Sequence, residues 1–293
     1  MTLVLGFADE VAPAQRLAAA LRLEYAAIEM HRFPDGESRL TLPPELPPTV
    51  VLYRGLDHPD AKLVELLLAT RTARELGAER IILVTPYLCY MRQDMAFHPG
   101  EAVSQRIIGH FLADLADAVI TVDAHLHRIT HLNQAIPLPQ ARNLSAAPLL
   151  GEFLQKQNRD ALLLGPDEES RQWVEQVARA GGFDFGVADK VRHGDREVKI
   201  RLPELDYTQR RVVLVDDMIS SGHTLAETAG QLYRIGARSV DALCTHALYD
   251  TEATRLLSQA GIETIWSCDS VQHPSNAIQL APLLAESVME ILN

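Results

Sequence analysis

Residues 212–224 read Val-Val-Leu-Val-Asp-Asp-Met-Ile-Ser-Ser-Gly-His-Thr, an apolar run that ends in two acids and a loop of small residues. The run has the length of one buried strand, and residues 225–235 after the loop have helical apolar spacing. Open α/β sheets bind ligands at the carboxyl ends of strands, where the next helix offers free N–H groups to a phosphate. The stretch therefore predicts an α/β fold with a phosphate site beside carboxylates.

The same alternation of strand and helix runs along the rest of the chain. Apolar runs typical of buried parallel strands occupy residues 3–6, 49–53, 80–85, 118–122, 161–164, 211–215, 239–243 and 264–266. Helical periodicity falls between them at residues 61–76, 105–115, 169–180 and 225–235. This order favours parallel sheets with helices on both faces.

A length of 293 residues exceeds the usual size of one core, so two domains are expected. The phrase Glu-Leu-Gly-Ala-Glu-Arg-Ile-Ile at residues 75–82 is echoed by Arg-Ile-Gly-Ala-Arg-Ser-Val at 234–240. In each, a helix ends at a glycine that we expect to be left-handed, and a strand follows. A glycine between a helix and the next strand is common in α/β proteins, so this repeated segment alone does not decide whether the two halves of the chain arose by duplication. We predict domains at residues 1–147 and 148–293.

Composition excludes several classes of function. A net charge of −12 and a pI near 5.4 disfavour nucleic acid as the main partner. The three cysteines are too few and too widely separated for a disulfide framework or a zinc knuckle. Asp9 and Glu10 interrupt the first apolar run too early for a signal peptide, and no run has the length of a membrane span. We expect a soluble, cytoplasmic protein without a membrane partner.

The strand, acid pair and loop of residues 212–224 resemble the phosphoribosyl-diphosphate motif shared by ribose-phosphate pyrophosphokinases and type I phosphoribosyltransferases. Asp216 and Asp217 are candidates to bind two ribose hydroxyls, because a carboxylate accepts hydrogen bonds from a vicinal diol; solvated turn carboxylates are the alternative. Thr224 and Glu227 match a capping box that would mark the start of the helix. The candidate ribose 5-phosphate site comprises Asp216, Asp217, Ser220, Ser221, Gly222, His223 and Thr224.

Two motifs in the first half of the chain resemble the pyrophosphokinase family specifically. Residues 32–37, Arg-Phe-Pro-Asp-Gly-Glu, are similar to its adenine-site motif, and residues 86–94 to its second ATP-contacting motif. A phenylalanine could stack on a purine, and an arginine could neutralise phosphate charge. Taken singly, Phe33 could equally be a core aromatic and residues 34–36 an ordinary turn. The resemblance implies ATP-binding residues Phe33, Asp35, Glu37, Arg92, Gln93 and Asp94.

The resemblance also implies two ligands for Mg²⁺. His125 follows the strand at 118–122 and matches the family's metal-binding histidine, although hard cations prefer oxygen ligands. Asp167 follows the strand at 161–164, but Glu-Glu-Ser at 168–170 replaces the family's usual glycines. That acidic run has an alternative role as favourable charge in the first turn of a helix. We interpret His127 and His131 as surface or packing residues.

Residues 188–192, Ala-Asp-Lys-Val-Arg, resemble the start of the family's catalytic flexible loop. Lys190 and Arg192 match its two cationic positions and are the candidate catalytic residues; a solvated surface lysine is the alternative. Residues 194–200 resemble the archaeal-type, or class III, members. His223 departs from the family's usual glycine.

The chain is thus identified as a member of the ribose-phosphate pyrophosphokinase family. The resemblance implies two similar type I phosphoribosyltransferase-like α/β domains, the first with the ATP motifs and the second with the sugar phosphate site. It implies transfer of a diphosphoryl group from Mg-ATP to ribose 5-phosphate in a homodimer or higher homo-oligomer. A phosphoribosyltransferase and a non-catalytic nucleotide-binding homologue remain the alternatives.

Overall fold

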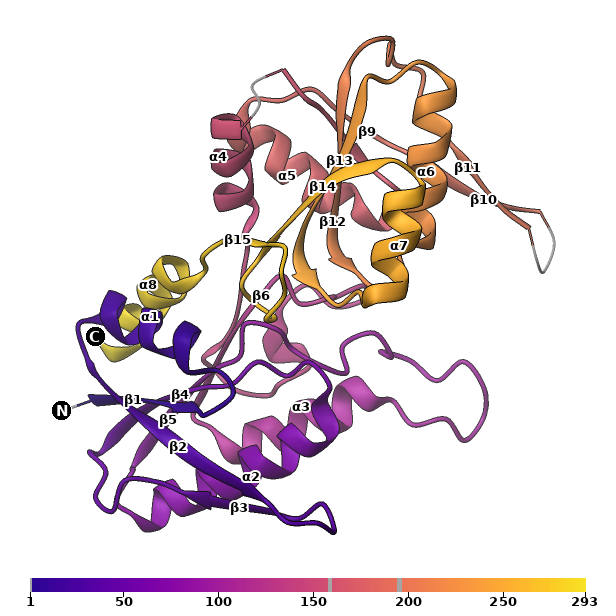
Figure 1. Cartoon of the computed structure of the whole chain (residues 1–293). Coiled ribbons are helices and arrows are strands. Elements are labelled where there is room, and N and C mark those ends of the chain that lie inside the picture. Colours follow the sequence, from indigo (N-terminus) through magenta and orange to yellow (C-terminus); the bar gives the residue numbers. More distant parts are fainter. Residues whose placement is uncertain (1, 158–159, 194–196) are drawn as a thin grey trace. The chain divides into compact units, whose positions relative to one another are not determined.

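The computed structural model describes residues 2–157, 160–193 and 197–293, which form two compact units. Unit 1 comprises Met1–Leu144 and Leu280–Asn293, and unit 2 comprises Ser145–Gln279 (Figure 1). Each unit is built on one mainly parallel sheet flanked by helices, which confirms the predicted α/β architecture.

The sheet of unit 1 has the strand order β3-β2-β1-β4-β5-β6-β7, and only the β2–β3 pair is antiparallel. Its strands are β1 (Thr2–Phe7), β2 (Glu24–Arg32), β3 (Ser38–Thr41), β4 (Thr49–Tyr53), β5 (Arg80–Val84), β6 (Ala118–Val122) and β7 (Ala141–Leu144). Its helices are α1 (Val11–Leu21), α2 (Pro59–Glu75), α3 (Ser104–Leu115), the short 3₁₀ helix η1 (Leu132–Gln134) and α8 (Ala281–Leu292).

The sheet of unit 2 is parallel, with the order β15-β14-β13-β12-β8-β9. Its strands are β8 (Leu162–Gly165), β9 (Phe185–Val187), β12 (Arg211–Ile219), β13 (Ser239–Ala247), β14 (Ile262–Cys268) and β15 (Asn276–Ile278). A separate antiparallel hairpin joins β10 (Asp189–His193) to β11 (Glu197–Arg201). The helices are α4 (Ala147–Gln157), the 3₁₀ helix η2 (Glu168–Ser170), α5 (Arg171–Gly181), α6 (His223–Arg234) and α7 (Thr251–Gln259).

The two units share one topology. Numbered along the chain without the antiparallel β3, the strands of both sheets follow the order 2-1-3-4-5-6. In each, strand order reverses between the first and third strands, a position that we call the switch point. The repeated phrase falls at the same crossover in both, between α2 and β5 and between α6 and β13. Gly77 and Gly236 there have φ of 106° and 96°, as the left-handed cap requires. The units are therefore similar in sequence pattern and in fold.

Two helices join the unit that does not contain the preceding strand. Helix α4 follows β7 of unit 1 but packs on α5 of unit 2, whereas α8 follows β15 of unit 2 but packs on α1 of unit 1. Leu284, Val288 and Ile291 of α8 are buried. The division at 1–147 and 148–293 stays a prediction for the domains; the compact units assign the last helix differently, because an apolar helix follows the core that covers it.

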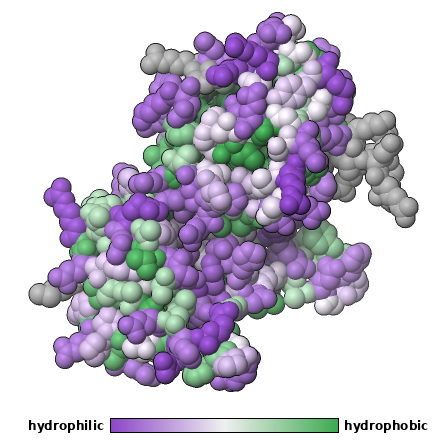
Figure 2. Space-filling model, viewed as in Figure 1, coloured by the Kyte–Doolittle hydropathy of each residue, from purple (hydrophilic) through white to green (hydrophobic). Residues whose placement is uncertain are grey.

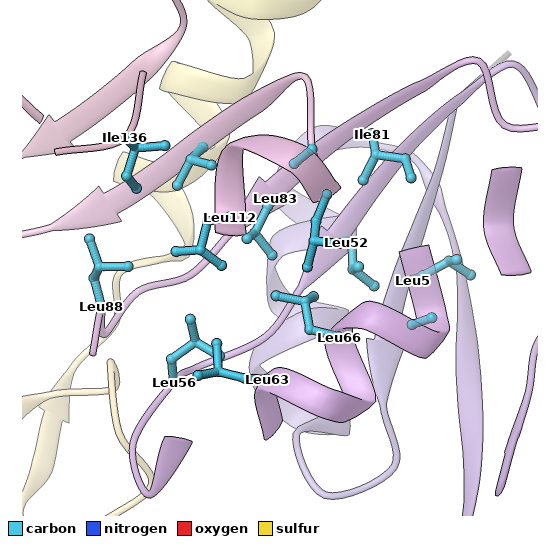
Figure 3. Close-up of a cluster of buried hydrophobic side chains, with 14 of the residues drawn as sticks. Leu5, Leu52, Leu56, Leu63, Leu66, Ile81, Leu83, Leu88, Leu112 and Ile136 are labelled. Carbon is cyan, nitrogen blue, oxygen red and sulfur yellow. The ribbon is translucent and has the colours of Figure 1, made fainter. Parts of the chain in front are cut away.

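The core of unit 1 lies between its sheet and the helices α2 and α3 (Figure 3). Leu5, Leu52 and Leu83 come from three adjacent strands and meet Leu66 of α2 and Leu112 of α3. Burying each such side chain stabilises the fold by about 1.5–3 kcal/mol relative to exposure. The sheet that carries the loops is therefore a rigid platform.

Polar and charged side chains cover most of the visible face, and the apolar patches between them are small (Figure 2). Within the described ranges, no helix combines the length and the apolar character that a membrane crossing requires. Cys89, Cys244 and Cys268 are buried free thiols.

Candidate functional site

The switch point of unit 2 lies between β8 and β12. These strands pair only over residues 162–164 and 212–214, after which β12 continues to Ile219 beside β13 alone. Asp216 and Asp217 therefore lie on the part of β12 that pairs with a neighbouring strand on one side only. In this topology the opening so formed is where ligands bind.

The acids at this point crowd one another. Asp217 is buried, and its N–H donates to Oδ1 of Asp216 at 2.9 Å. Burial raises the pKa of Asp216 well above its usual value, and the negative charges of Asp217 and Asp167 raise it further. The alternative of solvated turn carboxylates does not hold for Asp217. Three carboxyl groups near one another favour binding of a cation or of hydroxyl donors, either of which relieves their repulsion.

Helix α6 begins beside these acids without a side-chain cap. Gly222 is its N-cap residue and has a φ of 75°, and no side chain in the described ranges caps this end. The helix starts at His223, so the predicted capping box of Thr224 and Glu227 is wrong. With the left-handed Gly222 as N-cap, the helix starts two residues too early for Thr224 to be the cap. The α6 N-terminus therefore offers backbone N–H groups and a positive dipole end to an anion.

The remaining residues of the loop face outward. Ser220, Ser221 and His223 are exposed, whereas Gly222 is buried against Leu257. Hydroxyl groups and the first turn of α6 thus lie where a phosphate can reach them. His223 leaves the loop open, because its side chain points to solvent rather than into the turn.

Asp167 is held at the carboxyl end of β8 by a local turn. Its side chain accepts from the Ser170 N–H at 3.3 Å, and Ser170 Oγ donates to the Asp167 carbonyl at 2.5 Å. Glu168 pairs with Arg171 at 2.5 Å, and Glu169 is exposed. Residues 168–170, which stand where the family usually has glycines, therefore form a capping turn whose two glutamates are exposed. Asp167 stays near the acid pair.

Lys190 and Arg192 belong to β10, where their backbones lie opposite Ile200 and Val198 of β11. The side chains of both residues lie outside the described part of the chain, as do residues 194–196. Their catalytic assignment stays a prediction.

In unit 1 the first ATP motif forms the turn between β2 and β3. The Phe33 N–H donates to the Glu37 carbonyl at 2.8 Å, and Gly36, with a φ of 94°, donates to the Phe33 carbonyl at 2.9 Å. The Glu37 N–H also donates to Asp35 Oδ1 at 3.2 Å. Phe33 is 39% exposed and meets the edge of the His31 ring at 4.8 Å. Phe33 is therefore not a core aromatic, and its ring is accessible to a planar ligand.

The second ATP motif forms a loop after β5 whose residues differ in exposure. Gln93 accepts from Ser104 Oγ at 3.0 Å, and Asp94 accepts from Arg128 at 2.5 Å. The Asp94 side chain is buried, and its Oδ2 has no hydrogen-bond partner among the described residues. Arg92 is exposed. Gln93 and Asp94 fasten the loop, whereas Tyr90 and Arg92 are exposed.

His125 follows β6 on an unusual turn. Asp123 is buried with a φ of 41°, and its N–H donates to the Leu144 carbonyl at 2.8 Å. The half-buried His125 ring meets the exposed His127 ring edge-on at 4.1 Å. The left-handed Asp123, a sparsely populated conformation for a residue other than glycine, re-aims the chain at this strand end. The sequence showed an acid at the strand end but not this conformation.

The equivalent switch point of unit 1 is occupied by an ion network that sequence reasoning missed. Arg54, 1% exposed, follows β4 and pairs with Asp9 at 2.5 Å and with Glu10 at 3.2 Å. It also pairs with Glu65 of α2, and its guanidinium lies 4.2 Å from the centre of the Phe7 ring. The available signal was a charged residue close to the end of each of two buried runs: Arg54 directly after β4, and Asp9 two residues after β1.

Glu10 is the most perturbed acid of this network. It accepts from the Gly55 N–H at 3.0 Å, and burial raises its pKa to about 7 against the lowering influence of Lys62 and Arg54. Lys62 pairs with Asp57 at 2.6 Å. Each acid at this switch point thus has a cationic partner within the protein.

The site and fold define a phosphoribosyltransferase-type protein, and the comparisons agree. Residues 142–282 match the phosphoribosyl transferase domain, and residues 3–115 match the N-terminal domain of ribose phosphate pyrophosphokinase. The ribose-phosphate pyrophosphokinase of Methanopyrus kandleri is 41% identical, covering 98% of each chain. That of Methanosarcina acetivorans is 35% identical, covering 95% of this chain and 96% of the relative.

Solved structures show the same fold. The phosphoribosylpyrophosphate synthetase of Mycobacterium smegmatis matches with a TM-score of 0.84 and 22% identity, covering 100% of this chain and 99% of that one. The chain therefore belongs to the ribose-phosphate pyrophosphokinase family.

Proposed function

We propose that this protein is a ribose-phosphate diphosphokinase. It transfers the diphosphoryl group of Mg-ATP to the C1 hydroxyl of ribose 5-phosphate, which yields phosphoribosyl diphosphate and AMP. The observation that carries this proposal is the carboxylate cluster beside the uncapped N-terminus of α6, in a chain that matches this family over nearly its full length.

Ribose 5-phosphate binds at the switch point of unit 2. Asp216 and Asp217 accept hydrogen bonds from the two ribose hydroxyls, and the first turn of α6 binds the 5-phosphate. Ser220, Ser221 and Thr224 supply hydroxyl donors to the same anion. The support is that residues 220, 221 and 223 are exposed and that no side chain in the described ranges caps α6.

ATP binds through the two motifs of unit 1. Phe33 stacks on the adenine, Asp35 or Glu37 accepts from its amino group, and Arg92 offsets phosphate charge. The exposure of residues 33, 35, 37 and 92 supports these assignments. Gln93 and Asp94 contribute by fixing the loop that carries Arg92.

The residues of the site fit Mg²⁺. Asp167 lies near the acid pair, and burial together with the negative charges of Asp217 and Asp167 raises the pKa of Asp216. A dication that prefers oxygen ligands would stabilise these acids in their ionised form. His125 is the proposed ligand from unit 1. When bound, Mg²⁺ neutralises phosphate charge. Lys190 and Arg192 offset the charge that develops on the transferring group, and positioning accounts for most of the rate.

We also propose a cytoplasmic homodimer or higher homo-oligomer. The acidic pI and the reduced, buried thiols are consistent with a cytoplasmic protein. Light scattering coupled to size-exclusion chromatography measures the oligomeric state directly, and a monomeric mass would overturn this part of the proposal.

A direct assay tests the function. The protein is mixed with ribose 5-phosphate, ATP and MgCl₂, and the products are separated by ion-exchange chromatography. We expect AMP and phosphoribosyl diphosphate in equal amounts, both dependent on Mg²⁺. Binding of ATP without AMP would indicate a non-catalytic homologue. Consumption of phosphoribosyl diphosphate with a free base would indicate a phosphoribosyltransferase.

A further inference from the structure

The hairpin that presents Phe33 extends beyond the sheet of unit 1. Strand β2 pairs with β1 only up to Ile28, and its last four residues pair with β3 alone. The turn at residues 33–37 is exposed throughout. A two-stranded ribbon is only marginally stable in water, so the orientation of this turn depends on an additional contact.

Glu65 of α2 supplies that contact. Its Oε1 accepts from Arg32 Nη2 at 2.7 Å and from Ser38 Oγ at 3.4 Å. Arg32 and Ser38 lie opposite each other in the β2–β3 register and flank the turn on either side. One carboxylate oxygen therefore holds both strands at the point where the turn begins. We call Arg32, Ser38 and Glu65 the hairpin clasp.

The clasp is anchored in the interior of unit 1. The Glu65 side chain is 2% exposed, and its second oxygen, Oε2, accepts from the buried Arg54. Arg54 is fixed in turn by Asp9 and Glu10 at the end of β1. A buried charge pair with several partners resists reorientation, because moving either member would leave a charge uncompensated. The turn is thus connected to the switch point by charge-assisted hydrogen bonds.

We infer that Glu65 is a positioning residue for the nucleotide: through Arg32 and Ser38 it holds the turn of residues 33–37 in the orientation that binds ATP. The inference rests on the proposed function, in which that turn contacts the adenine. Unit 2 has no counterpart on the equivalent helix, because the single carboxylate of α6, Glu227, is exposed. Among the described side chains, the clasp therefore occurs only in unit 1, on the helix after the third parallel strand.

Charge removal at Arg32 tests the clasp without disturbing the interior. In R32Q the pair between Glu65 and Arg54 remains, so the protein folds, which circular dichroism and thermal unfolding verify. Because a charge-assisted hydrogen bond at the base of the turn is lost, we expect KM for ATP to rise about tenfold. The kcat and KM for ribose 5-phosphate stay within twofold, and R32K recovers part of the loss.

R39Q is the matched control. Arg39 lies next to Ser38 on β3, and its side chain is exposed. The substitution removes the same charge from the same hairpin but leaves the clasp intact, so KM for ATP stays within twofold. If R39Q and R32Q raise KM for ATP equally, the effect is one of overall charge, and the clasp is refuted.

A double-mutant cycle separates the clasp from a direct contact of Arg32 with ATP. E65Q removes the carboxylate charge, and the clasp predicts that R32Q has little further effect on KM for ATP in the E65Q background. If the effects of the two substitutions multiply, Arg32 acts on ATP directly and the inference is wrong. Should E65Q not fold, S38A alone tests the clasp, because it removes only the second hydrogen bond to Glu65. The clasp predicts a rise in KM for ATP smaller than that of R32Q, and an unchanged KM for ATP in both variants would refute it.

F33A distinguishes failure of the clasp from failure of the proposed function. If F33A leaves KM for ATP unchanged, the turn does not bind the nucleotide, and the ATP assignment itself is wrong. If F33A raises KM for ATP while R32Q and E65Q do not, the turn binds ATP but the clasp does not position it.

Discussion

The two switch points of this protein have the same topology but different neighbours around their acids. In unit 2, Asp167, Asp216 and Asp217 gather beside an uncapped helix, and burial with mutual repulsion raises the pKa of Asp216. In unit 1, the acids after β1 meet Arg54 at the end of β4, so their charge is compensated within the protein. A cluster of neighbouring acids offers ligands to a cation or to hydroxyl donors, whereas acids paired with a buried arginine stabilise the structure. Duplication of a fold therefore does not duplicate its site.

The units also use one insertion point in two ways. An antiparallel hairpin follows the first crossover in both: the second parallel strand β2 pairs with β3 in unit 1, whereas the separate strands β10 and β11 follow the second parallel strand β9 in unit 2. The first carries the proposed adenine contacts, and the second carries Lys190 and Arg192. The two hairpins thus carry different proposed binding residues, as the two switch points carry different charged neighbours.

Breaking the network of unit 1 has the largest expected effect. R54M removes the buried cation and leaves Asp9, Glu10 and Glu65 without their shared partner. We expect a loss of about 3–5 kcal/mol in the free energy of unfolding, measured by urea denaturation. KM for ribose 5-phosphate stays within twofold in the remaining folded enzyme. A rise in that KM would mean that the unit 1 switch point takes part in sugar binding.

The corresponding substitution in unit 2 is expected to lower activity rather than stability. D217N removes a charged acceptor from the ribose hydroxyls, so kcat/KM for ribose 5-phosphate falls about 100-fold or more in steady-state assays. The melting temperature holds or rises, because one of three repelling carboxylates is neutralised. A destabilised but fully active D217N would show that this acid is structural, like those of unit 1.

The pH dependence of stability identifies the contribution of Glu10. Its pKa in the folded protein is raised from 4.5 to about 7, so the folded state binds more protons than the unfolded state between these values. The contribution is complete below pH 4.5 and is lost as pH rises through 7. It amounts to roughly 1–3 kcal/mol in urea denaturation across that range. E10Q flattens the curve; an unchanged slope would assign it to another group.

Two left-handed glycines provide a smaller, matched contrast. Gly222 has a φ of 75°, and an added Cβ would lie 3.0 Å from Leu257, whereas Gly36 has a φ of 94° with nothing within 4 Å. G36A therefore loses only the conformational term of about 1–2 kcal/mol, and G222A loses more. We expect G222A to raise KM for ribose 5-phosphate and G36A to raise KM for ATP. Identical profiles for both variants would contradict the separation of the two sites.

The smallest effect belongs to the acidic run after Asp167. Glu168 is exposed and pairs with Arg171, away from the acid pair. E168Q should leave both KM values and kcat within twofold in the AMP-formation assay. A larger change in KM for ribose 5-phosphate would place Glu168 in the site and reopen the significance of the family departure at residues 168–170.

Much of the fold was predictable because its signals are local. The buried runs that we predicted as strands became β1, β4, β5, β6, β8, β12, β13 and β14, and the four predicted helices formed. Strands β2, β3, β7, β9, β10, β11 and β15 and helices α1, α4, α7 and α8 were not predicted. The missed strands are short or are interrupted by polar residues. Their formation depends on the sheet and helices that they pack against.

By itself, the sequence determined where glycine caps the helices at 77 and 236, and that Asp216 and Asp217 precede a turn of small residues at the start of a helix. Only the tertiary structure decided that Arg54 meets acids more than 40 residues away, that α4 and α8 exchange units, and that Asp94 is buried while Arg92 is exposed. Backbone caps and buried runs are set by neighbours in the chain. Charge pairing and burial depend on strand order, which brings distant segments together.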